Sequence, residues 1–265
     1  MISLSELSIY PIKSTAQISL SRSLTGPFGL DMDRRWMLID EKGFMLTQRK
    51  HPEMCLIKSS LNNAQLTVSA TGMQSLSILT PDSSNTIKAT VWEDTCTSYD
   101  AGNSAADWFS TFLKTPARLV YFPIDEKRQV DLDYAKKGDI TAFSDGFPYL
   151  LISQASLDDL NARLSTAVEM KRFRPNLVVT GTEPFAEDNW KQIRIGEIVF
   201  NLVKPCSRCV IPSIDPDTAE KTAEVVKTLA AYRMRENKIF FGQNMIAEAS
   251  GELAVGMQVE VLSTY

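Results

Sequence analysis

Stretches in which apolar and polar residues alternate recur along the chain, and alternation is typical of a strand with one buried face. Such residues occupy 17–21, part of 86–92 and 255–262. Apolar stretches on both sides of two short turns, at 41–43 and 196–197, predict two hairpins. The pattern therefore predicts many short strands.

Helical spacing of apolar residues is less common. It occurs at 105–113, behind Asn103 or Ser104 as a cap. A second helix is expected from 218 to about 233, with Asp217 as its cap.

A third helix is predicted at 153–164, where Ser156 and Asp159 weakly resemble a capping box. Many strands combined with a few helices predict a β-rich, barrel-like α+β protein.

The size and composition are those of an ordinary globular protein with one large or two modest domains. The 265 residues carry a formal net charge of −4, which argues against nucleic-acid binding because that normally requires a basic stripe. The first residues lack the features of a signal peptide, and no stretch approaches the ~20 apolar residues of a membrane helix. With four cysteines, we expect a cytoplasmic protein without membrane contact.

The richest candidate chemistry lies at 204–218, directly after an apolar, strand-like stretch. Cys206 and Cys209 stand three residues apart around Arg208. A thiolate is a soft, strongly donating ligand for a transition metal, and a neighbouring cation favours its formation. We expect the two thiols in a loop that presents a reactive group.

Other interpretations of the two cysteines stay open on the residues alone. A structural zinc site needs four ligands, and the remaining candidates, Cys55, Cys96 and the single histidine His51, lie far upstream. A thioredoxin-type centre should open a helix, whereas Pro205 and Pro212 bracket the thiols. Two small buried apolar residues would also fit.

The rest of the stretch distinguishes these interpretations. Residues 204–209, followed by 215–218, resemble the signature of MOSC proteins, named for the C-terminal domain of molybdenum-cofactor sulfurase. The closest resemblance is to the bacterial branch related to the mitochondrial amidoxime-reducing component. Further motifs of that family recur in the expected order, at 10–14, 29–36, 47–49, 143–148, 173–176, 194–196 and 241–244.

The resemblance implies a fold and an activity. It implies an N-terminal β-rich, barrel-like domain at 1–118, packed on a C-terminal MOSC β-barrel at 119–265. The implied activity is the reduction of N-hydroxylated compounds at a molybdenum held by molybdopterin, with Cys209 as the protein ligand. Cys206 either lines the site or packs beneath it.

The resemblance also implies the residues that serve the cofactor and the reaction. A phosphate-bearing pterin requires charge-assisted donors. We expect Asp145 and Asp215 to act with Cys209 in catalysis. The residues expected to bind the cofactor are Lys13, Ser14, Arg34, Ser144, Arg172, Arg174, Asn176, Ser207, Arg208 and Cys209.

An alternative from another class is a protein that binds the cofactor, or carries persulfide sulfur, without reducing a substrate. The sequence has no aminotransferase-like region, so we do not expect pyridoxal phosphate. It also lacks the C-x₄-C-x₂-C spacing of a plant-type iron–sulfur cluster. We therefore expect the reductase to depend on a separate electron-donor protein, either a reductase or a small ferredoxin-like protein.

Overall fold

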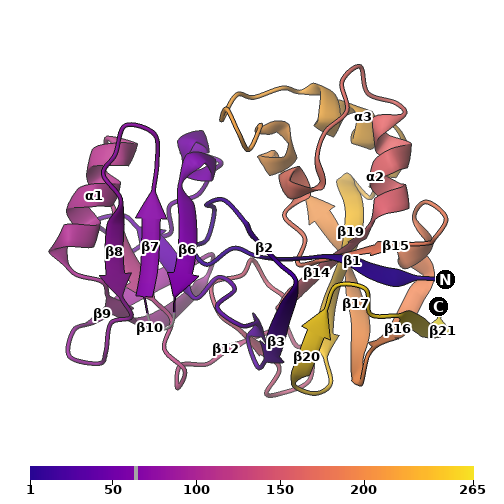
Figure 1. Ribbon diagram of the computed structural model, residues 1–265, viewed down its shortest axis with the longest axis horizontal. Coiled ribbons are helices and arrows are strands. Elements are labelled where there is room, and N and C mark those ends of the chain that lie inside the picture. The colour runs from indigo at the N-terminus through magenta and orange to yellow at the C-terminus, as the bar shows by residue number, and fades with distance from the viewer. Residues whose placement is uncertain (63–64) are drawn as a thin grey trace.

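Strands from both ends of the chain share one nine-stranded sheet in the computed structural model, which describes residues 1–62 and 65–265 (Figure 1). Its strands are β1 (Ser3–Ile9), β2 (Ile18–Leu20), β14 (Tyr149–Ser153), β15 (Leu177–Thr180), β16 (Trp190–Ile195), β17 (Ile198–Arg208), β18 (Met234–Arg235), β19 (Lys238–Ala247) and β21 (Val259–Thr264). The order is β2-β1-β15-β14-β19-β17-β16-β21, with β18 paired to β19. β14 and β15 are parallel, and the other neighbours are antiparallel.

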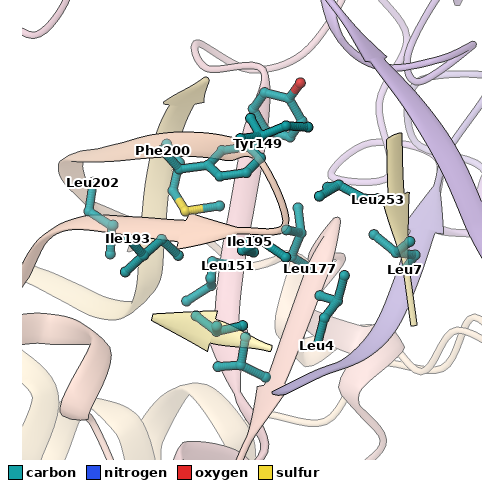
Figure 2. Packing of buried hydrophobic residues seen from close by; sticks show 14 of the residues in the cluster. Leu4, Leu7, Tyr149, Leu151, Leu177, Ile193, Ile195, Phe200, Leu202 and Leu253 are labelled. Atoms are coloured by element: carbon teal, nitrogen blue, oxygen red, sulfur yellow. The ribbon is translucent and has the colours of Figure 1, made fainter. Parts of the chain in front are cut away.

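Side chains from alternate positions of these strands form one core (Figure 2). In β17, Ile198, Phe200 and Leu202 are buried while the residues between them are less so. A slip of one residue would turn this apolar face toward solvent, so the alternation fixes the register. Figure 2 labels Phe200 and Leu202 together with Leu4, Leu7, Tyr149, Leu151, Leu177, Ile193, Ile195 and Leu253.

A second body, drawn at the left of Figure 1, contains two further sheets and one α-helix among the residues that the structure describes. One sheet has the order β5-β11-β10-β9 and comprises β5 (Trp36–Ile39), β9 (Thr86–Val91), β10 (Asp94–Asp100) and β11 (Arg118–Tyr121). The other comprises β6 (Lys58–Asn62), β7 (Gln65–Ser69) and β8 (Leu76–Leu79). Helix α1 (Asn103–Leu113) buries Trp108 and Phe109 in the core of this body.

Short elements complete the frame. Small sheets are formed by β3 (Arg22–Gly26), β4 (Gly29–Leu30) and β20 (Gly251–Ala254), and by β12 (Arg128–Gln129) and β13 (Ile140–Thr141). Helices α2 (Gln154–Asn161) and α3 (Glu224–Arg233) pack on the large sheet through Leu157, Leu160 and Leu229. The 3₁₀ turns are η1 (Pro52–Leu56), η2 (Met170–Phe173), η3 (Ala186–Asn189) and η4 (Ile211–Ser213). Within the described residues, none of the helices has the length and apolarity needed to span a bilayer.

Several predicted strands are confirmed, including β2, β9 and the β16–β17 hairpin. The strand predicted at 255–262 is wrong in its first half. Residues 255–257 join β20 to β21 through a turn in which Gly256 has a φ of 92°, and Gln258 forms only an isolated bridge with Ser3. The hairpin predicted around 41–43 forms only in part. Its first arm is the strand β5, whereas its second arm makes isolated bridges through Phe44 and Met45.

The helices form near their predicted places, but their ends differ. Gly102, with a φ of 86°, precedes α1 and replaces the predicted side-chain cap. In α2 the cap is Ser153, whose side chain accepts a hydrogen bond from the Ser156 amide, and the helix ends at Asn161. The residue before α3 is Ala223, so Asp217 does not cap it.

Candidate active site

A cavity of about 660 Å³ opens where the end of β17 meets loops from both bodies. It is lined by the loop after β1, the turn before β5, residues 144–147 and the segment that follows β17. The structure brings most of the sequence-predicted site residues to this cavity: Lys13, Ser14, Arg34, Ser144, Asp145, Arg174, Asn176, Ser207, Arg208 and Cys209.

Two predicted site residues, Arg172 and Asp215, are not among the lining residues. Their side chains pair with each other, with Nη2 of Arg172 2.7 Å from Oδ2 of Asp215. Arg172 also donates to the carbonyl of Pro212, a lining residue. Asp215 accepts hydrogen bonds from the amides of Asp217 and Thr218, which holds the turn after η4. The pair therefore supports the cavity wall from behind.

The cavity is strongly cationic, although the whole chain carries a net charge of −4. Among the described residues that line it, one is acidic, Asp145, and the cations are Lys13, Arg34, Arg49, Arg174, Lys204, Arg208 and Lys238. A recessed site lined by one sign of charge concentrates ligands of the opposite sign. The lining therefore suits an anionic ligand.

Two arginines that are far apart in the sequence contact the same buried aromatic ring. The Cζ atoms of Arg34 and Arg174 lie 4.2 and 4.1 Å from the centroid of the Tyr10 ring. Arg34 also donates to Oδ1 of Asn176 at 3.0 Å, and Arg174 donates to the carbonyl of Thr15 at 2.6 Å. Burial lowers the pKa of Arg174 to about 10, so it stays charged at neutral pH.

Backbone strain is concentrated at the same place. Ser14, Arg34 and Arg174 have φ angles of 69°, 48° and 59°, in the left-handed region that non-glycine residues rarely adopt. Strain of this kind is typical of ligand-binding sites, where the surrounding structure enforces it.

Lys13 and Asp145 form an ion pair at the cavity wall. The Nζ atom of Lys13 lies 2.6 Å from Oδ1 of Asp145 and donates to the carbonyl of Phe143 at 2.8 Å. Burial lowers the pKa of Lys13 to about 8, against the opposing effect of Asp145. Burial would raise the pKa of Asp145, but Lys13, Arg49 and Arg34 outweigh it and hold that pKa well below its usual range.

Both thiols of the CxxC pair line the cavity, each beside a guanidinium group. Cys209 is exposed, and Nη2 of Arg49 donates to its Sγ at 3.5 Å. Cys206 is half-buried, and Nη1 of Arg208 donates to its Sγ at 3.1 Å. We predicted both thiols in a loop, but Cys206 lies in a strand, because β17 continues to Arg208. The pairing of β17 with β19 shifts register before and after Pro205, and such irregularities allow a proline within a strand.

The other cysteines and the histidine lie elsewhere. Cys55 and Cys96 are buried, and burial raises the pKa of each thiol to about 11. His51 lies beside Glu53, with 3.5 Å between Nδ1 and Oε1. Within the described part of the chain, no group of three or more His, Cys, Asp or Glu side chains is placed to hold a metal ion.

The lining residues that the sequence-based site list did not include are, among others, Arg49, Trp92 and Lys204. Arg49 belongs to the motif at 47–49, which was the one signal for it. Lys204 opens the motif at 204–209, which was the signal for it. Trp92 stands in no motif that marks a site, and only the packing of the two bodies reveals it.

The residues present fit a phosphate-bearing pterin that carries a thiolate-binding transition metal. Oγ of Ser144 is buried in the cavity wall, and among the described residues it has no hydrogen-bond partner. Buried hydroxyls are normally satisfied, so a bound ligand is the natural partner. Lys and Arg donors suit phosphate, and the exposed thiol of Cys209 suits a transition metal such as molybdenum.

Comparison with known families agrees with this fold. The MOSC N-terminal beta barrel domain matches residues 1–116, and the MOSC domain matches residues 139–260. The chain belongs to the MOSC family, in the group that includes the mitochondrial amidoxime-reducing components. The predicted family and the predicted β-rich α+β fold class are thereby confirmed.

Individual relatives match over nearly the whole chain. Mitochondrial amidoxime-reducing component 1 of Homo sapiens is 35% identical over 276 residues, which cover 97% of this chain and 82% of that protein. Mitochondrial amidoxime reducing component 2 of Rattus norvegicus is 35% identical over 274 residues, covering 95% and 81%. The solved structure of the YUAD protein from Bacillus subtilis overlaps 98% of this chain and 95% of that chain, with a TM-score of 0.44 and 11% identity.

Proposed function

We propose that this protein is a molybdenum-cofactor-dependent reductase of N-hydroxylated compounds, with Cys209 as the protein ligand to the metal. One observation carries the proposal: an exposed thiol stands in a cationic cavity of a chain related to amidoxime-reducing components. When bound, such a cofactor supplies two electrons and an open metal position for converting an N–OH group and two protons to N–H and water.

The cavity residues divide the binding of the cofactor among them. Lys13, Arg34, Arg174 and Arg208 would neutralise the phosphate, and Ser14, Ser144 and Ser207 also line the cavity and carry hydroxyls. Asn176 serves through Arg34, because its Oδ1 accepts from Arg34 and from the Leu150 amide while Nδ2 donates to the Ser8 carbonyl.

The two predicted catalytic carboxylates have different surroundings. Asp145 lines the cavity and stays ionised beside Lys13, so it can hold a cationic group of the substrate or product there. Asp215 stands behind the wall with Arg172, and its contribution is to hold the segment that carries Pro212. Asp145 is therefore the carboxylate that we assign to the reaction.

A pair of cysteine variants tests the proposal. Cys209→Ala, purified from a molybdenum-replete host, should lose both bound molybdenum and amidoxime reduction. Cys206→Ser should keep molybdenum and lose only part of the activity, because its thiol contacts Arg208 from within β17. Amidoxime reduction by Cys209→Ala at the wild-type rate would refute the assignment of the ligand, and loss of molybdenum from Cys206→Ser alone would reverse the two roles.

The second candidate function is a carrier of the cofactor or of persulfide sulfur, favoured by the exposure of Cys209. Turnover with a chemical reductant separates the two, since a carrier binds molybdenum but reduces no amidoxime. The reductase requires an electron donor, which we propose to be a separate protein. The absence of pyridoxal phosphate and of an iron–sulfur cluster, and the cytoplasmic location, remain predictions.

A further inference from the structure

Trp92 occupies a turn position for which its residue type is poorly suited. It is the first of the two residues that join β9 to β10, and its φ is 57°. Two-residue hairpin turns with a positive φ select Gly, Asn or Asp, because a bulky side chain strains that backbone. Departures from local preference concentrate at functional sites.

Two contacts fix the indole ring at the cavity. The Cζ atom of Arg49 lies 4.5 Å from the ring centroid, and Nε1 of Trp92 donates to Oδ1 of Asp145 at 3.3 Å. Trp92 nevertheless remains 43% exposed and lines the cavity. A large aromatic surface is thus held in place and left open to a ligand.

The ring lies one side chain away from the thiol assigned to the metal. Arg49, which stacks on Trp92, also donates to Sγ of Cys209 at 3.5 Å. A substrate that reacts beside Cys209 therefore has the indole within reach of the rest of its body. Trp92 comes from the second body described above, which we call the N-terminal body, whereas Cys209 directly follows β17 of the large sheet.

We propose, building on the function proposed above, that Trp92 determines substrate specificity. Flat, conjugated N-hydroxylated substrates stack on its indole, while compact aliphatic ones gain little from it. The body that carries the β9–β10 hairpin thereby takes part in selecting the substrate.

The test compares kcat/KM for flat benzamidoxime and compact acetamidoxime, using the cofactor-loaded protein. Trp92→Leu should lower the benzamidoxime-to-acetamidoxime ratio about tenfold, the effect of one lost stacking contact, and Trp92→Phe should retain most of it. The affinity for benzamidoxime, measured by calorimetry on the oxidised holoenzyme, which does not turn over, should fall by the same factor in Trp92→Leu. The matched control is Phe44→Leu, since Phe44 is 52% exposed on the same body but outside the cavity lining.

Different outcomes overturn different claims. Equal losses in Trp92→Phe and Trp92→Leu would assign the effect to the hydrogen bond with Asp145 and overturn the stacking proposal. A Trp92→Gly protein that melts at a lower temperature but keeps the wild-type ratio would show a structural role only. If wild type reduces both amidoximes and Trp92→Leu leaves the ratio unchanged, this inference fails alone; if wild type reduces neither, the proposed function fails and this inference with it.

Discussion

Nη2 of Arg49 lies 3.5 Å from Sγ of Cys209, although 160 positions of sequence separate the two residues. The contact joins the N-terminal body to the segment that follows β17. A hydrogen bond from a charged donor is worth ~1.5–3 kcal/mol, or roughly tenfold or more in an equilibrium or rate constant. The thiol that we assign to the metal is therefore oriented by a residue from the other body.

Arg49→Gln should lower kcat/KM for benzamidoxime about tenfold while molybdenum remains bound, because Arg49 orients the thiol and supplies no metal ligand. Steady-state kinetics and metal analysis check this. Arg22→Gln is the matched control, since Arg22 is a 74% exposed arginine paired with Glu252 on the surface. Unchanged kinetics in Arg49→Gln would show that the contact has no role.

Asp145→Asn should destabilise the fold, because it leaves the Lys13 ammonium, 7% exposed, without its counter-ion. Breaking a buried pair costs ~3–5 kcal/mol, but Asp145 is 62% exposed and solvent screening reduces the expected loss to about 1–2 kcal/mol. Denaturant unfolding measures it. The control, Asp217→Asn, removes an exposed partner of Lys171 and should cost less than about 0.5 kcal/mol.

The same pair predicts a pH dependence. Lys13 has a folded-state pKa of about 8, below its ordinary value of 10.5, so the cost of its buried charge is full below pH 8 and falls away as the pH rises from about 8 to 10.5. Once Lys13 is neutral, the Asp145 carboxylate no longer stabilises a buried ammonium group, so replacing Asp145 costs less. The stability difference between wild type and Asp145→Asn should therefore shrink from pH 7 to pH 9.5, and a constant difference would contradict the assignment.

Gly242→Ala should destabilise the strand that backs the thiols. Gly242 has a φ of 83°, and an added Cβ would lie 2.8 Å from the Leu151 carbonyl oxygen and 2.6 Å from Cγ1 of Ile152. Overpacking combined with backbone strain predicts a loss of about 2–4 kcal/mol in unfolding free energy. Gly256→Ala is the control, because it has a similar φ of 92° and open space around it, and should lose only about 1 kcal/mol.

An electron-donor protein should be attracted by the cationic cavity mouth. The rate driven by such a partner should fall with added salt, because screening weakens electrostatically steered docking. Turnover driven by reduced viologen, itself a cation, should not fall under the same conditions. NADH or NADPH alone should drive no turnover, and coupling without any added partner would reveal a redox centre that the proposal lacks.

Local periodicity predicted the elements whose stabilising contacts repeat along the chain, such as the β16–β17 hairpin and the buried face of α2. It failed at 255–257, where alternating apolar residues continue through a turn that Gly256 permits. Helix ends were also missed, because the residues that fix them act over single positions, as Ser153 does.

The candidate site was predictable where a motif carried its residues, as with Lys13, Arg34 and Cys209. It was not predictable at Trp92, because the hairpin that carries this residue reaches the cavity only through packing between two bodies. The sequence also did not predict that Asp215 lies outside the cavity lining, because its partner Arg172 is 43 positions away in the chain.

The pairing of β1 with β15 has a consequence for how this molecule could be divided or recombined. The region matched by the N-terminal family domain, 1–116, contains β1 and β2, which complete the sheet built by strands from the other domain. If the chain were cut between β11 and β13, β1 would lie on one fragment and its partner β15 on the other. We expect the two fragments to fold together when mixed, because pairing of β1 with β15 would restore the large sheet. Exchange of one domain between relatives would likewise have to preserve a matching strand edge, so the two halves are constrained to change together.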